Sequence, residues 1–370
     1  MNAREDSNDY RQLFLQDVPL LDLRAPVEFE RGAFPGAVNI PLLDDQQREQ
    51  IGIRYKDAGQ DEAIRLGLEL ATPQIREQRL RDWIQFCESN PGGYLYCFRG
   101  GLRSRTAQQW LRERGVDYPL VRGGYKAMRR FLIDELERAL DEVPLVCVSG
   151  LTGVGKTRVL RRIRHHIDFE GLANHRGSAF GHDALDSQPA VIDWENAVAI
   201  AFLRHLERFP GAPVFVEDEG RMIGRISMPD GLYAALLKAP RAVLQVDIES
   251  RIRLIGEDYI QHNWPTYRRA HAANAEHAFR SFVLDNLSRI QRRLGGERYR
   301  QVRLCFEHAL DVFFRTGQVE AFYPGIGTLL EQYYDPMYRY QIETKQPQII
   351  FEGPEQEFLQ WAKDFSAART

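Results

Sequence analysis

The strongest chemical signal in the sequence is a cysteine inside a loop rich in glycine and arginine. The loop contains, in order, Cys97, Arg99, Gly100, Gly101, Arg103 and Ser104. Glycines let backbone amides turn inward around an anion, and a following helix N-terminus and two guanidinium groups add positive potential. All of these features favour a thiolate over a thiol. The pattern therefore predicts a reactive Cys97 that handles an anionic group, with Arg99 and Arg103 as the cations of the site.

A second loop has the spacing that binds phosphates. Residues 150–157 fit the pattern G-x-x-x-x-G-K-[ST], with a buried apolar run before them and a helical pattern after them. Its candidate ligands are Gly150, Gly153, Gly155, Lys156 and Thr157. The glycines let the backbone wrap phosphate oxygens, Lys156 neutralises their charge, and the Thr157 hydroxyl can hold Mg²⁺. The loop predicts a diphosphate site and leaves open whether its ligand is ATP.

Acidic and basic groups follow the later apolar runs. The run at residues 214–216 ends in three acids, of which Glu217 and Asp218 are candidates to bind the metal through water, as a Walker B motif does. Four arginines also follow strand ends, and each is expected on the surface, with the alternative that one or two of them reach a phosphate: Arg221, Arg225, Arg251 and Arg253. A glycine-containing stretch at residues 176–181 is a candidate binding loop or an ordinary connection.

A strongly basic segment near residue 295 suits the phosphate backbone of RNA. Its candidate RNA-binding residues are Arg289, Arg292, Arg293, Arg298 and Arg300. The alternative interpretation is a solvated helix face. The helix after the phosphate loop is also rich in arginine and histidine and is a weaker candidate of the same kind.

The elements that must position these groups alternate between strands and helices. Expected strands cover residues 18–23, 38–41, 94–96, 145–149, 190–192, 214–216 and 243–246, and expected helices cover residues 104–114 and 156–167. In the block that begins near residue 142, this alternation predicts an α/β domain with a parallel sheet, and the first block is expected to be a separate α/β domain. We divide the chain into residues 1–140 with the cysteine loop, 141–248 with the phosphate loop, and a mainly helical extension at 249–370 that carries the basic segment.

Composition limits the class of protein. The chain has 370 residues and a net charge of −3, which argues against a positive potential over the whole surface that would attract nucleic acid. Its four cysteines are widely spaced, which argues against a zinc site and a disulfide framework. We expect Cys87, Cys147 and Cys305 to be buried structural residues. No apolar run approaches the length of about 20 residues that crosses a bilayer, and residues 1–10 are too polar for a signal peptide. The expectation is a cytoplasmic protein.

The cysteine loop and three further stretches resemble the rhodanese domain. These stretches are residues 21–24 with Glu28 and Phe29, residues 35–41, and residues 122–125. The resemblance implies a cysteine that carries sulfur or a heavier chalcogen, and a structural role for Asp22 and Arg24. The spacing departs from common sulfurtransferases, because Cys97 and Arg103 are arranged as C-x5-R in place of C-x4-R. The longer loop is similar to phosphatases of the same fold, so a phosphatase remains open.

A rhodanese domain fused to a phosphate-loop domain resembles the bacterial tRNA 2-selenouridine synthases over nearly the whole chain. The resemblance implies conversion of wobble 2-thiouridine to 2-selenouridine through an S-geranyl intermediate, with geranyl diphosphate and selenophosphate as donors. It implies that the phosphate loop binds the geranyl diphosphate, with Mg²⁺, and that Cys97 takes up selenium and delivers it to C2. It also implies that lysine, glutamate and glutamine tRNAs are substrates and that selenophosphate synthetase is a partner.

Three other functions share parts of these motifs. An ATP-dependent rhodanese-type sulfurtransferase would hydrolyse ATP and would not need selenophosphate. A C-x5-R phosphatase would release phosphate without tRNA. An RNA-binding regulator with an inactive phosphate loop is disfavoured, because Cys97, Lys156 and Thr157 are all intact.

Overall fold

The computed structural model describes residues 4–175 and 187–369. They divide into two compact units, one formed by Met1–Arg138 with Ala190–Arg204 and the other by Ala139–Pro189 with His205–Thr370. The candidate loop at residues 176–181 lies outside the described residues. Among the helices that are described, none combines the length and the apolar character needed to cross a membrane.

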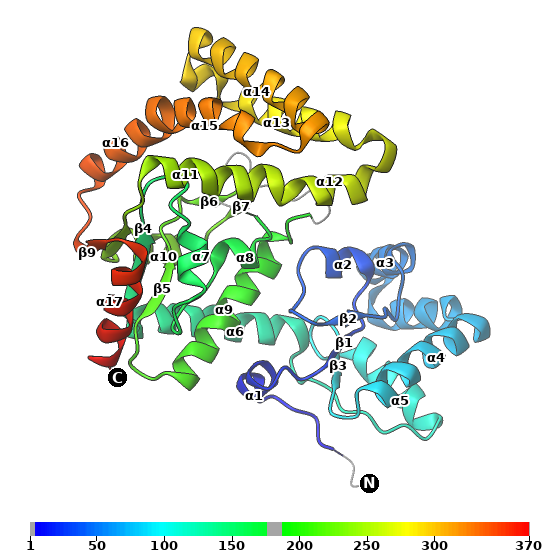
Figure 1. Ribbon diagram of the computed structural model, residues 1–370. Coiled ribbons are helices and arrows are strands. Elements are labelled where there is room, and N and C mark those ends of the chain that lie inside the picture. Colours follow the sequence, from blue (N-terminus) through cyan, green and yellow to red (C-terminus); the bar gives the residue numbers. More distant parts are fainter. Residues whose placement is uncertain (1–3, 176–186, 370) are drawn as a thin grey trace. The chain divides into compact units, whose positions relative to one another are not determined.

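The first unit is built on a parallel three-stranded sheet with the order β2-β1-β3 (Figure 1). Its strands are β1 (Leu20–Asp22), β2 (Val38–Asn39) and β3 (Tyr94–Tyr96). Around the sheet lie α1 (Tyr10–Leu15), α2 (Pro26–Glu30), α3 (Asp45–Leu70), α4 (Pro73–Ser89), α5 (Leu102–Glu113), most of α6 (Gly124–Glu142) and most of α9 (Val191–Arg208). Because the strands are parallel, the segments after β1 and β3 leave the sheet at the same edge, and the cysteine loop is one of them.

The core of this unit forms where α4 and α5 pack on the sheet. Trp83 and Leu111 are fully buried there, and the rings of Trp83 and Trp110 stack with centroids 6.1 Å apart. The buried spacing of Ala107, Trp110 and Leu111 is the apolar face that the helical periodicity of the sequence predicts. This packing fixes the helix that begins directly after the cysteine loop.

The second unit contains a parallel sheet with the order β5-β4-β8-β9. Its strands are β4 (Leu145–Ser149), β5 (Val214–Glu217), β8 (Arg241–Leu244) and β9 (Ile349–Gly353), and a small antiparallel pair is formed by β6 (Met222–Ile223) and β7 (Ile226–Ser227). Three helices accompany the sheet in the chain: α7 (Lys156–Leu160), α8 (Phe169–Leu172) and α10 (Asp230–Lys238). The α/β class is thus confirmed in both units, and the parallel sheet predicted for the phosphate-loop domain is confirmed in the second.

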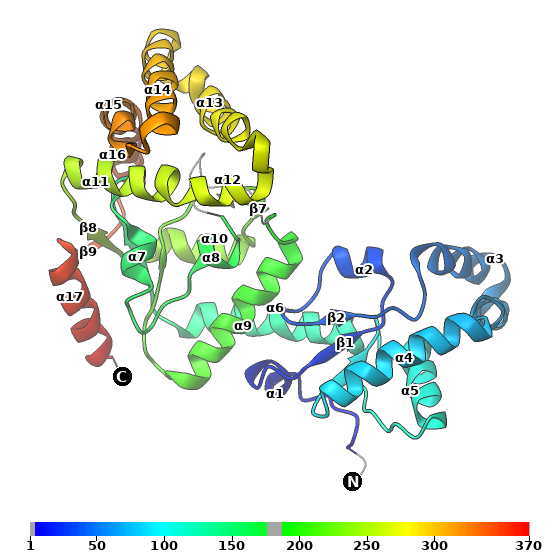
Figure 2. The same ribbon diagram turned by 45° about the vertical axis from the view of Figure 1, so that its right-hand side comes forward.

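The edge strand of this sheet comes from the C-terminal part of the chain, inside the expected helical extension. Strand β9 pairs in parallel with β8, and α17 (Glu355–Ala367) follows it and packs beside the sheet (Figure 2). Phe358 is fully buried in the core of the sheet, and Trp361 stacks on Phe351 with ring centroids 4.8 Å apart. Residues 349–367 are therefore part of the phosphate-loop fold.

Helices form the rest of the second unit. They are α11 (Ile248–Ile255), α12 (Asn263–His271), α13 (Ala275–Leu294), α14 (Gly296–Thr316), α15 (Tyr323–Leu329) and α16 (Asp335–Lys345), with π-helical turns at Gly256–Gln261 and Leu330–Tyr334. They enclose their own core around Phe279, Phe306 and Phe322. In Figures 1 and 2, α11 and α12 lie between the phosphate-loop sheet and α13–α15, so they connect the two parts of this unit.

Three expected elements differ from the structure. Residues 190–192, expected as a strand, lie at the start of helix α9, because Trp194, Val198 and Phe202 continue with helical spacing and are all fully buried. The helix expected over residues 156–167 ends at Leu160 as a regular helix, and the chain then returns to the sheet, where Ile167 N donates to the Phe215 carbonyl at 3.0 Å. The strand expected at 243–246 begins two residues earlier.

Candidate functional site

The cysteine loop is held by a close approach of two backbone segments. The amide of Tyr125 donates to the Cys97 carbonyl, and the amide of Lys126 donates to the Phe98 carbonyl, each at 2.9 Å. This contact requires glycine at Gly124, where φ is +58° and a Cβ atom would lie 2.2 Å from the Cys97 carbonyl oxygen. Gly123 and Gly124, which belong to the stretch that resembles the rhodanese domain, therefore allow the backbone contact that holds the cysteine loop in place.

The thiol of Cys97 lies next to a serine hydroxyl. Cys97 is 3% exposed, and its Sγ is 3.3 Å from Ser104 Oγ. Ser104 Oγ also lies 3.1 Å from the Gly101 carbonyl, to which it donates. Because this hydroxyl has one proton, the thiol donates to Ser104 in this arrangement, and a thiolate would accept the same proton after the hydroxyl turns. Ser104 can thus form a hydrogen bond with Cys97 both as a thiol and as a thiolate.

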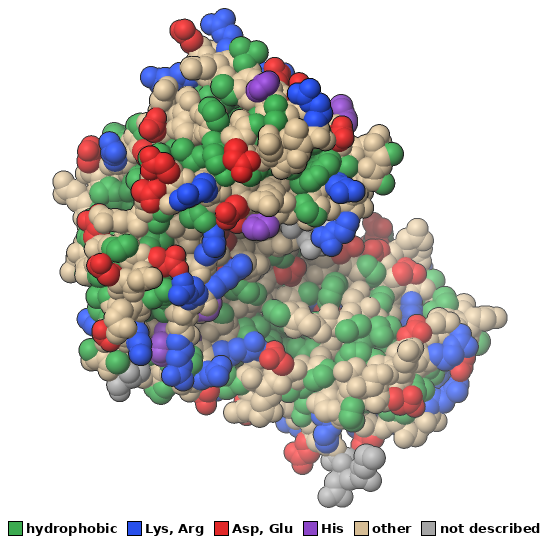
Figure 3. Space-filling view, viewed as in Figure 1, with side chains coloured by type: hydrophobic (Ala, Val, Ile, Leu, Met, Phe, Trp, Pro, Cys, Tyr) green, Lys and Arg blue, Asp and Glu red, His purple; other side chains and the backbone are tan. Residues whose placement is uncertain are grey.

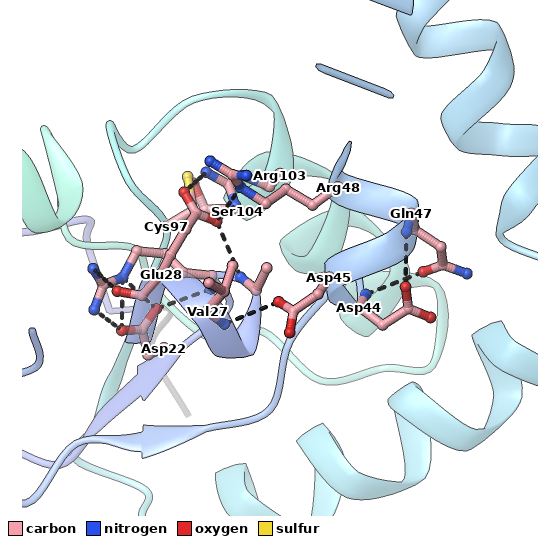
Figure 4. Close-up of polar contacts among 12 residues, drawn as sticks. Asp22, Val27, Glu28, Asp44, Asp45, Gln47, Arg48, Cys97, Arg103 and Ser104 are labelled. Atoms are coloured by element: carbon pink, nitrogen blue, oxygen red, sulfur yellow. Dashed lines mark hydrogen bonds and ion pairs between the residues drawn. The ribbon is translucent and has the colours of Figure 1, made fainter. Parts of the chain in front are cut away.

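Arg103 is paired with a carboxylate that the motif search did not select as a site residue. Its two terminal nitrogens donate to the two Glu28 oxygens at 2.5 and 3.1 Å, and Arg48 lies 3.7 Å from Glu28 (Figure 4). Burial raises the pKa of the Glu28 carboxyl, but the hydrogen bonds and charge of Arg103 outweigh it, so the pKa lies below its ordinary value. Figure 4 shows the Cys97 sulfur beside the Arg103 guanidinium, so this cation faces the thiol while Glu28 balances its charge.

The other predicted members of the loop differ in accessibility. Arg99 is exposed and lies over the ring of Phe98, 5.9 Å from its centroid. Gly100 and Gly101 form the turn into α5, with φ +63° at Gly100 and Gly101 at the N-cap. The predicted structural role of Asp22 agrees with its contacts: it is fully buried and accepts from Arg24 at 2.6 Å, and Arg24 lies 3.7 Å above the Tyr125 ring centroid.

The phosphate loop has the backbone conformation that its glycines predict. Positive φ angles occur at all three: 144° at Gly150, 83° at Gly153 and 80° at Gly155. A Cβ at Gly150 would lie 2.7 Å from the Leu244 carbonyl oxygen, so the neighbouring strand leaves no room for a side chain. Lys156 Nζ reaches back over the loop to the Gly150 carbonyl at 3.3 Å. This loop and its lysine can surround a diphosphate.

Glu217 and Asp218, the two acids that the sequence suggested for the metal, hold other groups of the fold. Glu217 is fully buried, accepts from the Phe169 amide at 2.9 Å and has a strongly raised pKa because of its burial and of Asp168 and Glu170 nearby. Asp218 accepts from Ser149 at 2.6 Å and pairs with buried Arg241 at 3.2 Å. A cavity lies at the phosphate loop and is lined by Lys156 and Thr157. Neither Glu217 nor Asp218 is among the described residues that line it.

Glu170 and Glu219 do line that cavity. Glu170 accepts from the Thr157 hydroxyl at 2.9 Å. Burial raises the pKa of Glu219 well above its ordinary value, and the nearby charge and hydrogen bond of Glu170 raise it further. Sequence reasoning missed Glu170, which lies in the short helix α8 outside any motif.

Thr157, Glu170 and Glu219 are better suited to Mg²⁺ that is bound together with a substrate phosphate than to a metal ion held by protein side chains alone. No cluster of three or more histidine, cysteine or acidic side chains suited to a metal occurs in the described ranges. Thr157 and Glu170 are hydrogen-bonded at this cavity, and Glu219 lies close enough to Glu170 for the charge of Glu170 to raise the pKa of Glu219, so a hydroxyl and two carboxyl groups come together there. Mg²⁺ is typically bound by one or two carboxylates, waters and the phosphates of a substrate.

The five candidate RNA-binding arginines divide into two groups. Arg289 and Arg293, on α13, line the cavity beside Lys156 and Thr157, whereas Arg292, Arg298 and Arg300 are exposed and are not among its lining residues. In the view of Figure 3, positive and negative side chains are interspersed over this part of the molecule. Arg251, expected on the surface, is 2% exposed and donates to Asp335 and to the Thr152 carbonyl of the phosphate loop.

The remaining cysteines differ in burial. Cys87 and Cys147 are buried, and burial raises the pKa of each thiol to about 12. Cys305 is half-buried, in contrast to the expectation that it is buried. All four cysteines are free thiols.

Comparison with known proteins matches both units. Residues 7–130 match the rhodanese-like domain, and residues 143–369 match the AAA domain of tRNA 2-selenouridine synthase. The chain is 47% identical to the tRNA 2-selenouridine synthase of Marinobacter nauticus, over 98% of this chain and 99% of that protein. The corresponding protein of Hahella chejuensis is 48% identical over 94% of this chain and 92% of its own length. The chain belongs to the tRNA 2-selenouridine synthase family of enzymes.

Proposed function

We propose that this protein converts wobble 2-thiouridine in lysine, glutamate and glutamine tRNAs to 2-selenouridine in two steps. The phosphate loop, in residues 141–248, serves a geranylation step, and the cysteine loop, in residues 1–140, serves a selenium step. Residues 249–370 contribute to tRNA binding, and selenophosphate synthetase supplies the selenium donor. The observation that carries the proposal is that two anion sites of different design occur in one chain of this family.

In the first step, the sulfur of 2-thiouridine attacks C1 of geranyl diphosphate. A carbon–sulfur bond forms, the carbon–oxygen bond to diphosphate breaks, and the N3 proton leaves the base. Lys156 and the loop amides stabilise charge that develops on the leaving diphosphate. Thr157, Glu170 and Glu219 would hold Mg²⁺, which neutralises further negative charge. The alkylated sulfur is then a better leaving group than a thiocarbonyl sulfur.

In the second step, selenium of selenophosphate attacks C2 and geranyl thiol leaves. Selenium has the selenide oxidation level in both donor and product, so the step is a substitution without redox change. The family resemblance implied that Cys97 stores the selenium itself. Transfer of selenium alone from selenophosphate to the thiolate would reduce phosphorus by two electrons, so the phosphorus product would be phosphite in place of phosphate. The balanced route transfers the phosphoryl group from selenium to Cys97 Sγ and then to water, which yields phosphate. The C-x5-R loop with Arg103 and the hydroxyl of Ser104 suits this phosphoryl transfer.

The experiment is mass spectrometry of nucleosides from tRNA incubated with the full-length protein and each donor, separately and together. Cys97→Ala is expected to accumulate S-geranyl-2-thiouridine, and Lys156→Ala is expected to leave 2-thiouridine unchanged. A wild-type protein that ignores both donors but hydrolyses ATP would overturn the proposal in favour of an ATP-dependent sulfurtransferase. Release of phosphate from phosphorylated substrates without tRNA would favour a phosphatase.

The fate of the phosphoryl group is tested by the intact mass of rapidly quenched protein. The route above predicts that one phosphoryl group is added during turnover and that it is absent in Cys97→Ser. Addition of selenium to Cys97 would refute this route and leave the two-step function standing.

A further inference from the structure

A cavity of about 980 Å³ lies between the phosphate loop and the helices of the second unit. Lys156 and Thr157 line it on the side of the loop, and Arg289 and Arg293 line it from α13. This volume is near the upper end of the range for small-molecule sites, about 300–1,000 Å³. A diphosphate occupies only part of it, so the ligand has a second, larger portion.

The charges around the cavity favour an anion. Its described lining includes six lysine or arginine side chains and three carboxyl groups. Arg289 and Arg293 are four residues apart on one helix, so their side chains leave the same face. Arg289 donates to the neutral amide oxygen of Asn286 at 3.0 Å, and no ion pair of either arginine with an acid is found among the described residues. Both guanidinium charges are therefore available to a ligand in the cavity that Lys156 also lines.

The rest of the wall is apolar and begins directly at the phosphate loop. A Cβ at Gly153 would lie 2.6 Å from the Ile255 side chain, so this isoleucine touches the loop itself. Leu254, Ile290, Tyr333, Tyr334 and Met337 continue the wall. Ile290 and Tyr333 are each less than 10% exposed, and the rings of Tyr333 and Tyr334 meet at right angles with centroids 4.8 Å apart. An apolar chain attached to the diphosphate would leave the loop onto this surface.

We propose that this cavity binds the whole isoprenoid diphosphate, with Arg289 and Arg293 holding the leaving diphosphate and the Ile255–Met337 wall selecting the chain. The inference rests on the proposed geranylation step and adds the residues that the sequence left unassigned. Two of the five candidate RNA-binding arginines thereby serve the diphosphate. Arg292, Arg298 and Arg300 remain for the tRNA backbone.

The charged end is tested by calorimetric binding of inorganic pyrophosphate and geranyl diphosphate to the full-length protein with Mg²⁺. Each charge-assisted contact is worth about 10- to 100-fold. The double variant Arg289→Ala/Arg293→Ala is expected to lose at least about tenfold in affinity for both ligands and to keep its tRNA affinity. Arg292→Ala/Arg298→Ala is expected to weaken tRNA binding only. Arg315→Ala, on exposed α14, controls for the loss of a surface cation.

The apolar wall is tested with a series of chain lengths. Wild type should bind geranyl diphosphate at least about tenfold more tightly than dimethylallyl diphosphate, since each buried methylene contributes about fourfold. Met337→Trp, which fills part of a half-exposed position, should remove this difference and leave pyrophosphate affinity unchanged. Met337→Ala enlarges the cavity and should raise the affinity for farnesyl diphosphate relative to geranyl diphosphate. This second variant tests the apolar wall if Met337→Trp does not fold.

Three results separate this inference from the function on which it rests. If Arg289→Ala/Arg293→Ala weakens tRNA binding and spares both diphosphates, the assignment of these arginines is wrong while geranylation stands. If wild type binds both chain lengths equally, the apolar wall does not hold the chain. If wild type binds pyrophosphate but neither alkylates tRNA nor binds geranyl diphosphate, the proposed function fails and a different diphosphate occupies the charged end.

Discussion

The contact between Gly124 and the cysteine loop gives a prediction with a built-in control. Gly124 and Gly115 both have positive φ, at 58° and 79°, so an alanine at either position must hold a left-handed backbone at a cost of about 1–2 kcal/mol. At Gly115 a Cβ meets nothing within 4 Å. At Gly124 it would lie 2.2 Å from the Cys97 carbonyl oxygen, against an ordinary carbon–oxygen separation of about 3.3 Å. The two segments must therefore separate by roughly 1 Å in the Gly124→Ala variant.

This displacement acts on the loop that presents Cys97 and Arg103. Overpacking of this kind adds about 1–3 kcal/mol to the backbone cost, so Gly124→Ala should lower the unfolding temperature about twice as much as Gly115→Ala. A shift of 1 Å at reacting groups costs about 100-fold in rate. In the nucleoside assay, we expect Gly124→Ala to accumulate the S-geranyl nucleoside, with selenium incorporation reduced about 100-fold and the geranylation rate unchanged. Gly115→Ala should retain both steps.

Equal loss of stability and equal rates of selenium incorporation in the two variants would contradict this prediction. That outcome would mean that the Gly124 contact does not position the cysteine loop. Equal loss of both steps in Gly124→Ala would instead show that the variant is globally misfolded, which circular dichroism detects independently.

Three further predictions concern the second unit. Arg241→Met removes the buried cation that pairs with half-buried Asp218 and should lower the free energy of unfolding by about 2 kcal/mol in urea titrations, with part of this recovered by adding Asp218→Asn. Burial lowers the pKa of His165, so it is neutral in the folded state and stability should fall as the pH drops below about 6.5, where the unfolded chain binds a proton. In His165→Phe a ring still packs against Phe209, whose centroid lies 4.5 Å from that of His165, and this variant should show a smaller loss of urea midpoint between about pH 7 and pH 5. An equal loss in both proteins would contradict this. Glu170→Gln should raise the Mg²⁺ concentration needed for half-maximal geranylation about tenfold and leave the selenium step unchanged, and chelation of Mg²⁺ should have the same selectivity.

The sequence was most informative where chemistry requires a fixed local spacing. The strand at 145–149 and the phosphate loop after it are found as predicted, because a buried β-branched run and a glycine pattern depend on neighbouring residues only. The strand at 94–96 and the cysteine loop are local in the same sense. Residues 190–192 were predicted incorrectly because a three-residue apolar run has no period, and the buried side chains that define helix α9 begin at Trp194.

The sequence by itself determined the fold class, the two glycine-rich loops that carry Cys97 and Lys156, and the family, since each depends on residue types at fixed spacing. Only the tertiary structure decided which distant groups complete those loops. Glu28 reaches Arg103 across 75 residues, and Thr157 donates to Glu170, whereas Glu217 and Asp218 contact Phe169, Ser149 and Arg241. Helix α13 places Arg289 and Arg293, and not Arg292, at the phosphate cavity, because residues four apart share a helix face and adjacent ones do not. Such choices follow from the packing of distant elements, which local spacing does not specify.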